Sequence, residues 1–182
     1  MPASLPFTAA PEANRLLAAD PLALLLGMLL DQQFPMERAF LSPLLAQRRL
    51  GGRLEAAAIA ALPEDDLVAV FTGPPALHRY PASMARRFAD LCRHLTDHYG
   101  GDAAALWRSS ADGEDLYRRL RALPGFGEAK ARILIGVLGR RLQAAPTGWE
   151  ARAADWPSVA DVSDFSQVAT LREQKRAMKE RG

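Results

Sequence analysis

The sequence predicts an all-α fold, and three observations support this prediction. Only 7% of the 182 residues are aromatic, and Ala, Leu and Arg are abundant whereas the β-branched residues are sparse, which favours helix over strand. Apolar residues recur at helical spacing, as at Met84, Phe88 and Leu91. No segment alternates apolar and polar residues in the way of a half-buried strand. We therefore expect about nine or ten short helices.

The expected helices fall into three successive parts of the chain. Residues 1–19 are expected to form a loose arm and a short helix. Residues 20–143 form the predicted core, which begins where Asp20 caps an apolar helix whose first residue is proline. Because this helix is apolar on nearly every side, we expect it to be the central, buried one. Residues 144–182 comprise an irregular segment and a basic C-terminal helix.

The charge of the chain is distributed unevenly. A net charge of +2 identifies no partner by itself, but basic residues gather in 117–121, 139–142 and 171–182. Such segregation can create a basic face on a nearly neutral protein. The longest apolar stretch, 21–30, is too short to span a bilayer, and the N-terminus lacks the pattern of a signal peptide. We therefore expect a cytoplasmic protein with no membrane partner.

The side chains that bind metals are few. Cys92 is the single cysteine, which excludes an intramolecular disulfide and a four-cysteine iron–sulfur cluster. His94 and His98 are spaced to share a metal on one helix face, but the sequence offers no evident third ligand. We therefore expect no metal site.

The segment between two expected helices, residues 121–142, reads RALPGFGEAKARILIGVLGRRL. Pro124 stops the first helix, and Gly125 and Gly127 lack a Cβ and can adopt positive φ. The amides at the start of the next helix could then bind a phosphate. The alternative is a plain turn between two packed helices.

This segment resembles the hairpin of the HhH-GPD superfamily, the helix-hairpin-helix DNA glycosylases of base excision repair, and in particular a small bacterial branch of it. The resemblance extends from the apolar helix and its Gln-containing end (21–40) through residues 77–95 to the hairpin (112–143). It implies an all-α, two-lobe fold with a cleft between the lobes, and duplex DNA and a damaged base as partners.

The resemblance also implies which residues contact DNA. Gln33 matches the family residue that can fill the gap left by a flipped base, and Gln32 is a candidate for the base pocket. Trp149 could stack on the base, or it could pin the irregular segment to the core. The remaining DNA-binding candidates belong to the hairpin and to one arginine pair: Leu123, Gly125, Phe126, Gly127, Ala129, Lys130, Arg86 and Arg87.

The catalytic residues of the family do not match. Thr147 stands where the family has its catalytic aspartate, so a substitute carboxylate is required, and Asp31, Asp155 and Asp161 are the candidates. The alternative roles of these aspartates are helix termination, capping and turn formation. Ala129 occupies the position of the Schiff-base lysine, and Lys130 is expected to point about 100° away from it, so lyase chemistry is not expected.

The expectation is therefore a monofunctional DNA glycosylase, a monomer associated with the nucleoid. It needs no cofactor and has no iron–sulfur cluster, and at most a monovalent cation binds at the hairpin. One alternative is a DNA- or lesion-binding protein that has lost catalysis. The other is a structural or protein-interaction role in which the hairpin is a relic.

Overall fold

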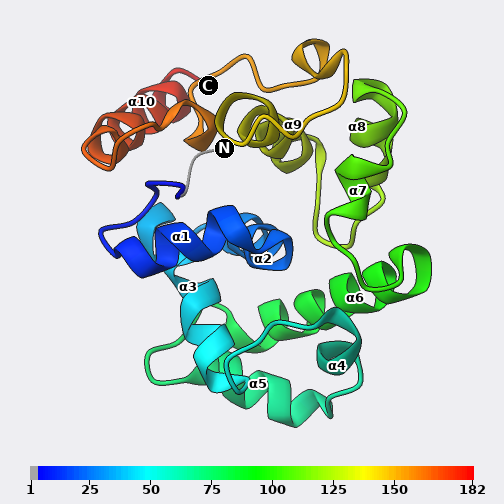
Figure 1. Cartoon of the computed structure of the whole chain (residues 1–182). Helices are drawn as coiled ribbons and strands as arrows, with labels where there is room; N and C mark the ends of the chain where they lie inside the picture. The colour runs from blue at the N-terminus through cyan, green and yellow to red at the C-terminus, as the bar shows by residue number, and fades with distance from the viewer. Residues whose placement is uncertain (1–3) are drawn as a thin grey trace.

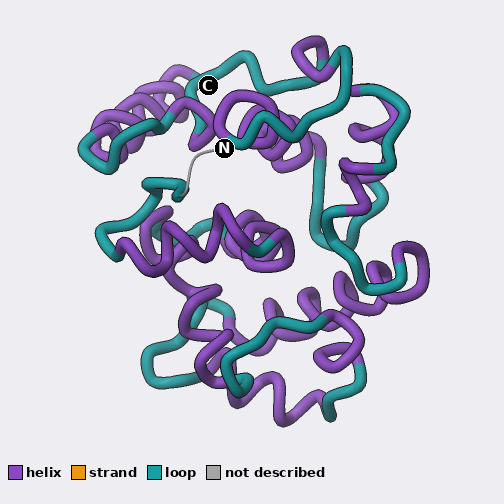
Figure 2. The backbone as a smooth tube through the Cα atoms, viewed as in Figure 1, coloured by secondary structure: helices purple, strands orange, loops and turns teal. Residues whose placement is uncertain are grey.

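The computed structural model describes residues 4–182, and these residues form helices and loops without any strand (Figure 2). The all-α prediction is confirmed. Residues 1–3 of the expected N-terminal arm lie outside the described residues. The α-helices are α1 (Pro11–Ala19), α2 (Pro21–Leu30), α3 (Met36–Arg49), α4 (Ala56–Ala60), α5 (Glu64–Thr72), α6 (Pro81–Tyr99), α7 (Ala105–Arg108), α8 (Gly113–Arg121), α9 (Glu128–Gly136) and α10 (Gln167–Arg181).

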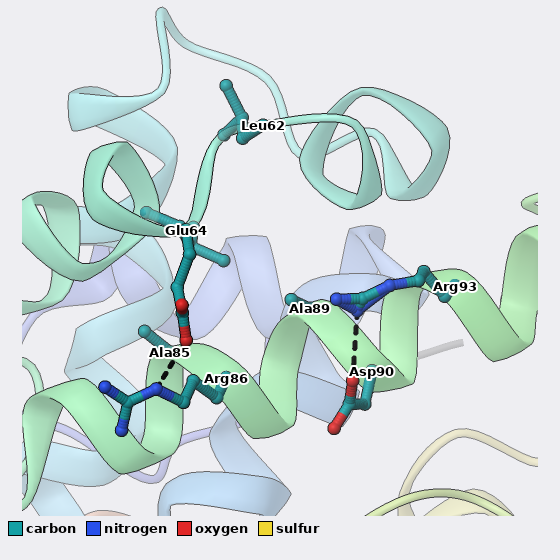
Figure 3. Close-up of a pocket in the computed structure, with 8 residues that line it drawn as sticks. Leu62, Glu64, Ala85, Arg86, Ala89, Asp90 and Arg93 are labelled. Carbon is teal, nitrogen blue, oxygen red and sulfur yellow. Dashed lines mark hydrogen bonds and ion pairs between the residues drawn. The ribbon is translucent and has the colours of Figure 1, made fainter.

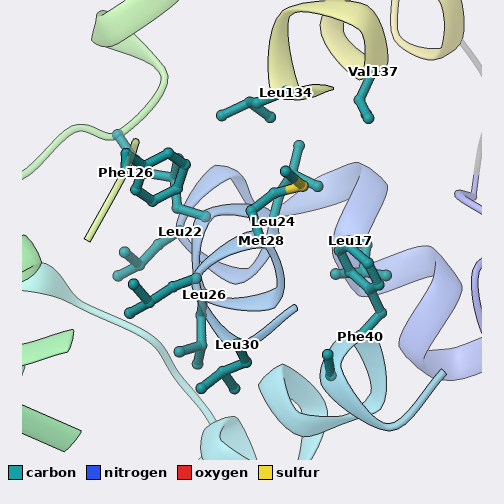
Figure 4. Close-up of a cluster of buried hydrophobic side chains, with 14 of the residues drawn as sticks. Leu17, Leu22, Leu24, Leu26, Met28, Leu30, Phe40, Phe126, Leu134 and Val137 are labelled. Atoms are coloured by element: carbon teal, nitrogen blue, oxygen red, sulfur yellow. The ribbon is translucent and has the colours of Figure 1, made fainter. Parts of the chain in front are cut away.

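Helix α2 lies at the centre of the molecule, as the sequence predicts. The carboxylate of Asp20 accepts the N–H groups of Leu22 (2.9 Å) and Ala23 (3.4 Å), which caps the helix. Nine of its ten residues are buried. Figure 4 shows its apolar side chains surrounded by Phe40 of α3 and by residues of the C-terminal half such as Phe126. This helix therefore joins the two halves of the core.

Helices α3 to α6 form one group below α2 in Figure 1. Helix α3 continues through Pro43 to Arg49. Helix α6 buries an apolar stripe against α4 and α5 and ends at Gly100, whose positive φ of 60° suits a glycine. The loop before α6, residues 73–80, reaches back to the end of α2.

Helices α8 and α9 pair as the predicted hairpin, and α9 packs on α2 from above (Figure 1). A π-helical turn, η1 (Val137–Arg141), extends α9. The irregular segment that follows contains two short 3-10 turns, η2 (Trp149–Ala151) and η3 (Val159–Asp161). Helix α10 closes the chain, and only its residues Val168 and Leu171 are buried.

Within residues 4–182, no single helix has the length and apolarity to cross a membrane. Helices α1 and α2 taken together, although bent relative to each other, have enough length and apolar composition.

Candidate nucleic-acid interface

The turn between α8 and α9 rests directly on the end of α2. Gly125 has a φ of +85°, and a Cβ on this residue would lie 2.4 Å from Cδ1 of Leu29. The left-handed backbone therefore favours a glycine here, and any larger residue would force the Leu29 side chain to shift. Gly127 differs from the expectation, because its φ is −83° and a Cβ there would meet nothing within 4 Å. Its missing side chain leaves open space in front of the hairpin instead.

The first amides of α9 face that open space. The first intrahelical bond runs from the Ala131 N–H to the Gly127 carbonyl (3.1 Å), so the three preceding amides have no acceptor within the helix. No side chain in the described part of the chain caps this end. An N-terminus of this kind attracts an anion, although Glu128 in the first turn opposes it with its own charge.

Two of the hairpin residues predicted to bind DNA are buried. Leu123 is 3% exposed and Phe126 is 4% exposed, and both belong to the main core. The Phe126 N–H also donates to the Leu123 carbonyl (3.1 Å). Both side chains therefore anchor the turn to α2 and its neighbours, and a contact of either residue with DNA through its backbone stays a prediction.

An open hollow of about 660 Å³ lies between the hairpin and the end of α2. It brings together seven residues predicted from the sequence, from three separate segments: Asp31, Gln32, Arg87, Gly125, Gly127, Ala129 and Lys130. It also includes Ile133 of α9 and Lys175 of α10. We call this space the hairpin hollow.

Asp31 is the carboxylate of the hairpin hollow. Its backbone N–H ends α2 by donating to the Gly27 carbonyl (3.1 Å), while its side chain is partly buried. Burial raises the pKa of this carboxyl above its usual range, and the charges of Lys175 and Lys130 act in the opposite direction. Two cations from different helices therefore favour the ionised form of a desolvated carboxylate.

Lys130 lines the hollow, and its side chain extends to the end of α2. Its Nζ donates to the Leu29 carbonyl (2.6 Å) and to Oε1 of Gln32 (3.2 Å). Burial lowers the pKa of Lys130 to about 8, although Asp31 acts to raise it, and Arg87 lowers it further. The lysine thus ties the second hairpin helix to the end of α2.

The loop after α2 is held in an unusual conformation. Gln33 has a φ of +55°, which a non-glycine residue rarely adopts and which costs about 1 kcal/mol or more. Nε2 of the buried His78 donates to the Gln32 carbonyl (2.8 Å), and Nδ1 accepts the Tyr80 N–H (3.0 Å). This pattern requires the neutral imidazole. Residues far apart in sequence therefore fix the exposed Gln33 beside the hairpin hollow.

The other two candidate acids lie elsewhere. Asp155 is 82% exposed and lies 3.6 Å from Arg132. Asp161 pairs with Arg140 (3.0 Å) and accepts the Ser158 N–H (3.0 Å) in a capping box. Neither lines the hairpin hollow. Asp161 fills the capping role that was its alternative, whereas Asp155 is an exposed residue near Arg132.

The position of the family aspartate is also remote from the hairpin hollow. The carbonyl of Thr147 accepts the Gly113 N–H (2.9 Å) at the N-terminal end of α8. The hairpin turn follows the opposite end of this helix. Thr147 is exposed there and lines no part of the hollow.

Trp149 and Arg86 are likewise outside the hollow. Trp149 lies over η1, where a Cβ on Gly139 would meet its ring at 2.4 Å, so it pins the irregular segment to the core as its alternative reading proposed. Arg86 pairs with Glu64 (2.5 Å) in a separate pocket between α5 and α6 (Figure 3). Its neighbour Arg87 is the one that reaches the hairpin hollow.

Sequence reasoning missed His78 as a support of the Gln33 loop. It contacts the loop across 46 positions in the chain, a pairing that no local pattern reveals. For Lys175, the sequence shows only that it belongs to the basic C-terminal helix and does not show that it lines the hollow.

Comparisons with family models, curated proteins and solved structures find no match to the chain. Within residues 4–182, no three His, Cys, Asp or Glu side chains form a group that could hold a metal ion.

Substitution of the two hairpin glycines by alanine should separate folding from binding. Gly125→Ala should lower the free energy of unfolding by more than about 1 kcal/mol, because the backbone is left-handed and Leu29 blocks the Cβ. Gly127→Ala should leave it within about 0.5 kcal/mol but weaken duplex DNA binding about tenfold by obstructing the phosphate. Denaturant unfolding and fluorescence anisotropy measure the two effects. Unchanged DNA affinity in Gly127→Ala would contradict this role of the hairpin.

His78 should make stability depend on pH. Burial lowers the pKa of His78 below its usual 6.5, so the unfolded chain binds the proton first. The stabilisation is complete above pH 6.5 and is lost as the pH falls, by at most about 1.4 kcal/mol per pH unit. Denaturant unfolding of His78→Gln from pH 7.5 to 5 should show a flatter dependence than the parent. Parallel curves would disprove the assignment, since the other titrating groups are common to both proteins.

Proposed function

We propose that the protein acts in base excision repair by binding duplex DNA, and that it is a monofunctional DNA glycosylase that hydrolyses the N-glycosidic bond of a flipped, damaged base. The observation that carries this proposal is the hairpin hollow, which places the partly buried carboxylate of Asp31 beside the glycine turn of the hairpin. In this interpretation the helices form two lobes, and the hairpin hollow is part of the cleft between them.

The hairpin supplies the contact with the DNA backbone. The free amides at the start of α9 would bind a phosphate, and Arg87, Lys130 and Lys175 add positive charge around the same hollow. Such contacts position the duplex without reading its sequence. The strained, exposed Gln33 stands next to this site, where it can enter the base stack and replace an extruded nucleotide.

Asp31 supplies the carboxylate that the chemistry requires. Cleavage of the glycosidic bond builds positive charge on the sugar, and a nearby carboxylate stabilises that charge and can orient the attacking water. Lys130 and Lys175 counteract the effect of burial on the pKa of Asp31. They therefore favour the ionised form of this carboxylate.

The proposal excludes lyase chemistry. An amine must present a free lone pair to the sugar to attack it, and the Nζ of Lys130 is instead bound to the Leu29 carbonyl and to Gln32. We therefore assign it a structural and electrostatic role.

One observation favours the alternative, a DNA- or lesion-binding protein without catalysis. Thr147 occupies the position of the family's aspartate and lies at the start of α8, away from the hairpin hollow. Under either proposal the protein is a monomer associated with the nucleoid. It uses no metal cofactor, and at most a monovalent cation binds at the hairpin.

Asp31→Asn should reduce single-turnover base release from a lesion-bearing duplex by about 100-fold or more, because the oxocarbenium ion loses its counter-charge. Affinity for undamaged duplex should change little. Asp155→Asn and Asp161→Asn are matched controls outside the hollow and should release the base at the parental rate. Borohydride should trap no covalent adduct with any of these proteins.

Base release that survives in Asp31→Asn would refute the role of Asp31. Salt-sensitive DNA binding without release from any lesion would favour the non-catalytic alternative. A trapped adduct that disappears in Lys130→Met would show that lyase chemistry occurs.

A further inference from the structure

Helix α10 packs on the core only through its first turns. Val168 and Leu171 are buried, whereas Met178 near the C-terminal end is 40% exposed. Between them, Lys175 lines the hairpin hollow and also a second hollow of about 520 Å³ between α10 and the start of α3. The second half of α10 therefore lies next to the hairpin hollow without being packed against the core.

Four cations of α10 share one face of the helix. They follow one another at the spacing i, i+3, i+4 and i+7, which places side chains on the same side. The four are Arg172, Lys175, Arg176 and Lys179. Val168 precedes Arg172 by four residues and Lys175 by seven, so this cationic face continues the buried stripe of the helix. It is therefore on the side that faces the rest of the protein.

The acidic residues of α10 do not neutralise the cationic face. Each residue advances about 100° around a helix axis, so Glu173 and Glu180 lie about a quarter turn or more from the centre of this face, and Arg181 lies on the far side. Neither glutamate forms an ion pair with one of the four cations within residues 4–182. The charge of α10 is thus segregated around its axis.

Most of the cationic face has no partner in the part of the chain that the structure describes. Arg172 is paired with Glu37, and Lys175 lies near enough to Asp31 to affect its charge. Arg176 and Lys179 form no ion pair there. Like charges three and four residues apart destabilise a helix. A bound polyanion would remove this repulsion.

The length of the cationic face fits a nucleic-acid backbone. Residues 172–179 span about 10 Å of helix axis, and one strand of a duplex carries about three phosphates over that length. Lys175 connects this face with the hollow onto which the free amides of α9 open. An anionic membrane fits less well, because the apolar residues of the same face, Val168 and Leu171, are buried in the core and cannot enter a bilayer.

We propose, resting on the function proposed above, that the cationic face of α10 is a second contact with the DNA backbone. The duplex lies across the hairpin hollow, with one phosphate at the amides of α9 and neighbouring phosphates along α10. Because these cations contact phosphates only, they hold damaged and undamaged duplex equally.

The salt dependence of duplex binding tests this proposal whether or not catalysis occurs. The variant is Arg176→Gln/Lys179→Gln, whose two positions are exposed and outside both hollows. Each lost phosphate contact should reduce the slope of log affinity against log salt by about 0.9, so the double variant should lose about 1.8. Affinity at 0.1 M salt should fall at least about tenfold, by the same factor for a lesion-bearing and an undamaged duplex.

Arg53→Gln/Arg181→Gln is the matched control, because it removes the same two charges at other places. Arg53 is 82% exposed and lines a separate hollow beside α4, while Arg181 lies on the far side of α10. This control should keep the parental slope. The thermal midpoint of each variant monitors folding.

The outcomes separate this inference from the proposed function. An unchanged slope in Arg176→Gln/Lys179→Gln, or an equal loss in the control, would overturn the role of α10 even if DNA binding still depends on Gly127. Absence of duplex binding together with binding to phosphatidylglycerol vesicles would assign the face to a membrane and overturn it too. A reduced slope in a protein that releases no base would support the cationic face and contradict the glycosylase proposal instead.

Discussion

The contact between the α8–α9 turn and the end of α2 is the constraint on which the rest of the structure depends. A Cβ on Gly125 would lie 2.4 Å from Cδ1 of Leu29, and the Nζ of Lys130 donates to the Leu29 carbonyl (2.6 Å). This contact joins the C-terminal half of the protein to its central helix. It also places the free amides of α9 beside Asp31, the first residue after α2.

The same contact explains the electrostatics of the site. Packing the hairpin on α2 removes water from Asp31 and Lys130 together, which raises the pKa of the carboxyl and lowers the pKa of the amine. Each group acts against the effect of burial on the other. The site therefore holds a desolvated carboxylate and a lysine of lowered pKa next to the hairpin turn, and Lys175 adds a second cation from α10.

The sequence predicts the architecture well where local chemistry decides it. The all-α fold and the buried α2 follow from apolar spacing, and the start of α2 follows from its Asp20 cap. The helical spacing of Leu116, Leu120 and Leu123 likewise predicts that these side chains face the core, and all three are buried.

The rest depends on contacts between distant segments. Arg86 and Arg87 are adjacent on α6, but only Arg87 lines the hairpin hollow. This difference depends on where the hairpin packs in the fold, which the local sequence does not show. The place of Trp149 depends on the π-helical turn around Gly139, for which the sequence carries no recognised pattern. His78 supports the Gln33 loop through a hydrogen bond to Gln32, a residue 46 positions away in the chain.

Disulfide cross-linking tests most directly whether Asp31 faces the damaged nucleotide. Cys92 is the only cysteine of the chain; it is buried, and burial raises the pKa of its thiol, so an introduced cysteine would be the reactive one. The measurement is the yield of cross-link between Asp31→Cys or Asp155→Cys and a duplex with a short thiol tether at the damaged nucleotide. Our account predicts efficient cross-linking at position 31 and little at position 155, although Asp155 is 82% exposed. A yield that follows exposure instead, with position 155 ahead of position 31, would contradict it.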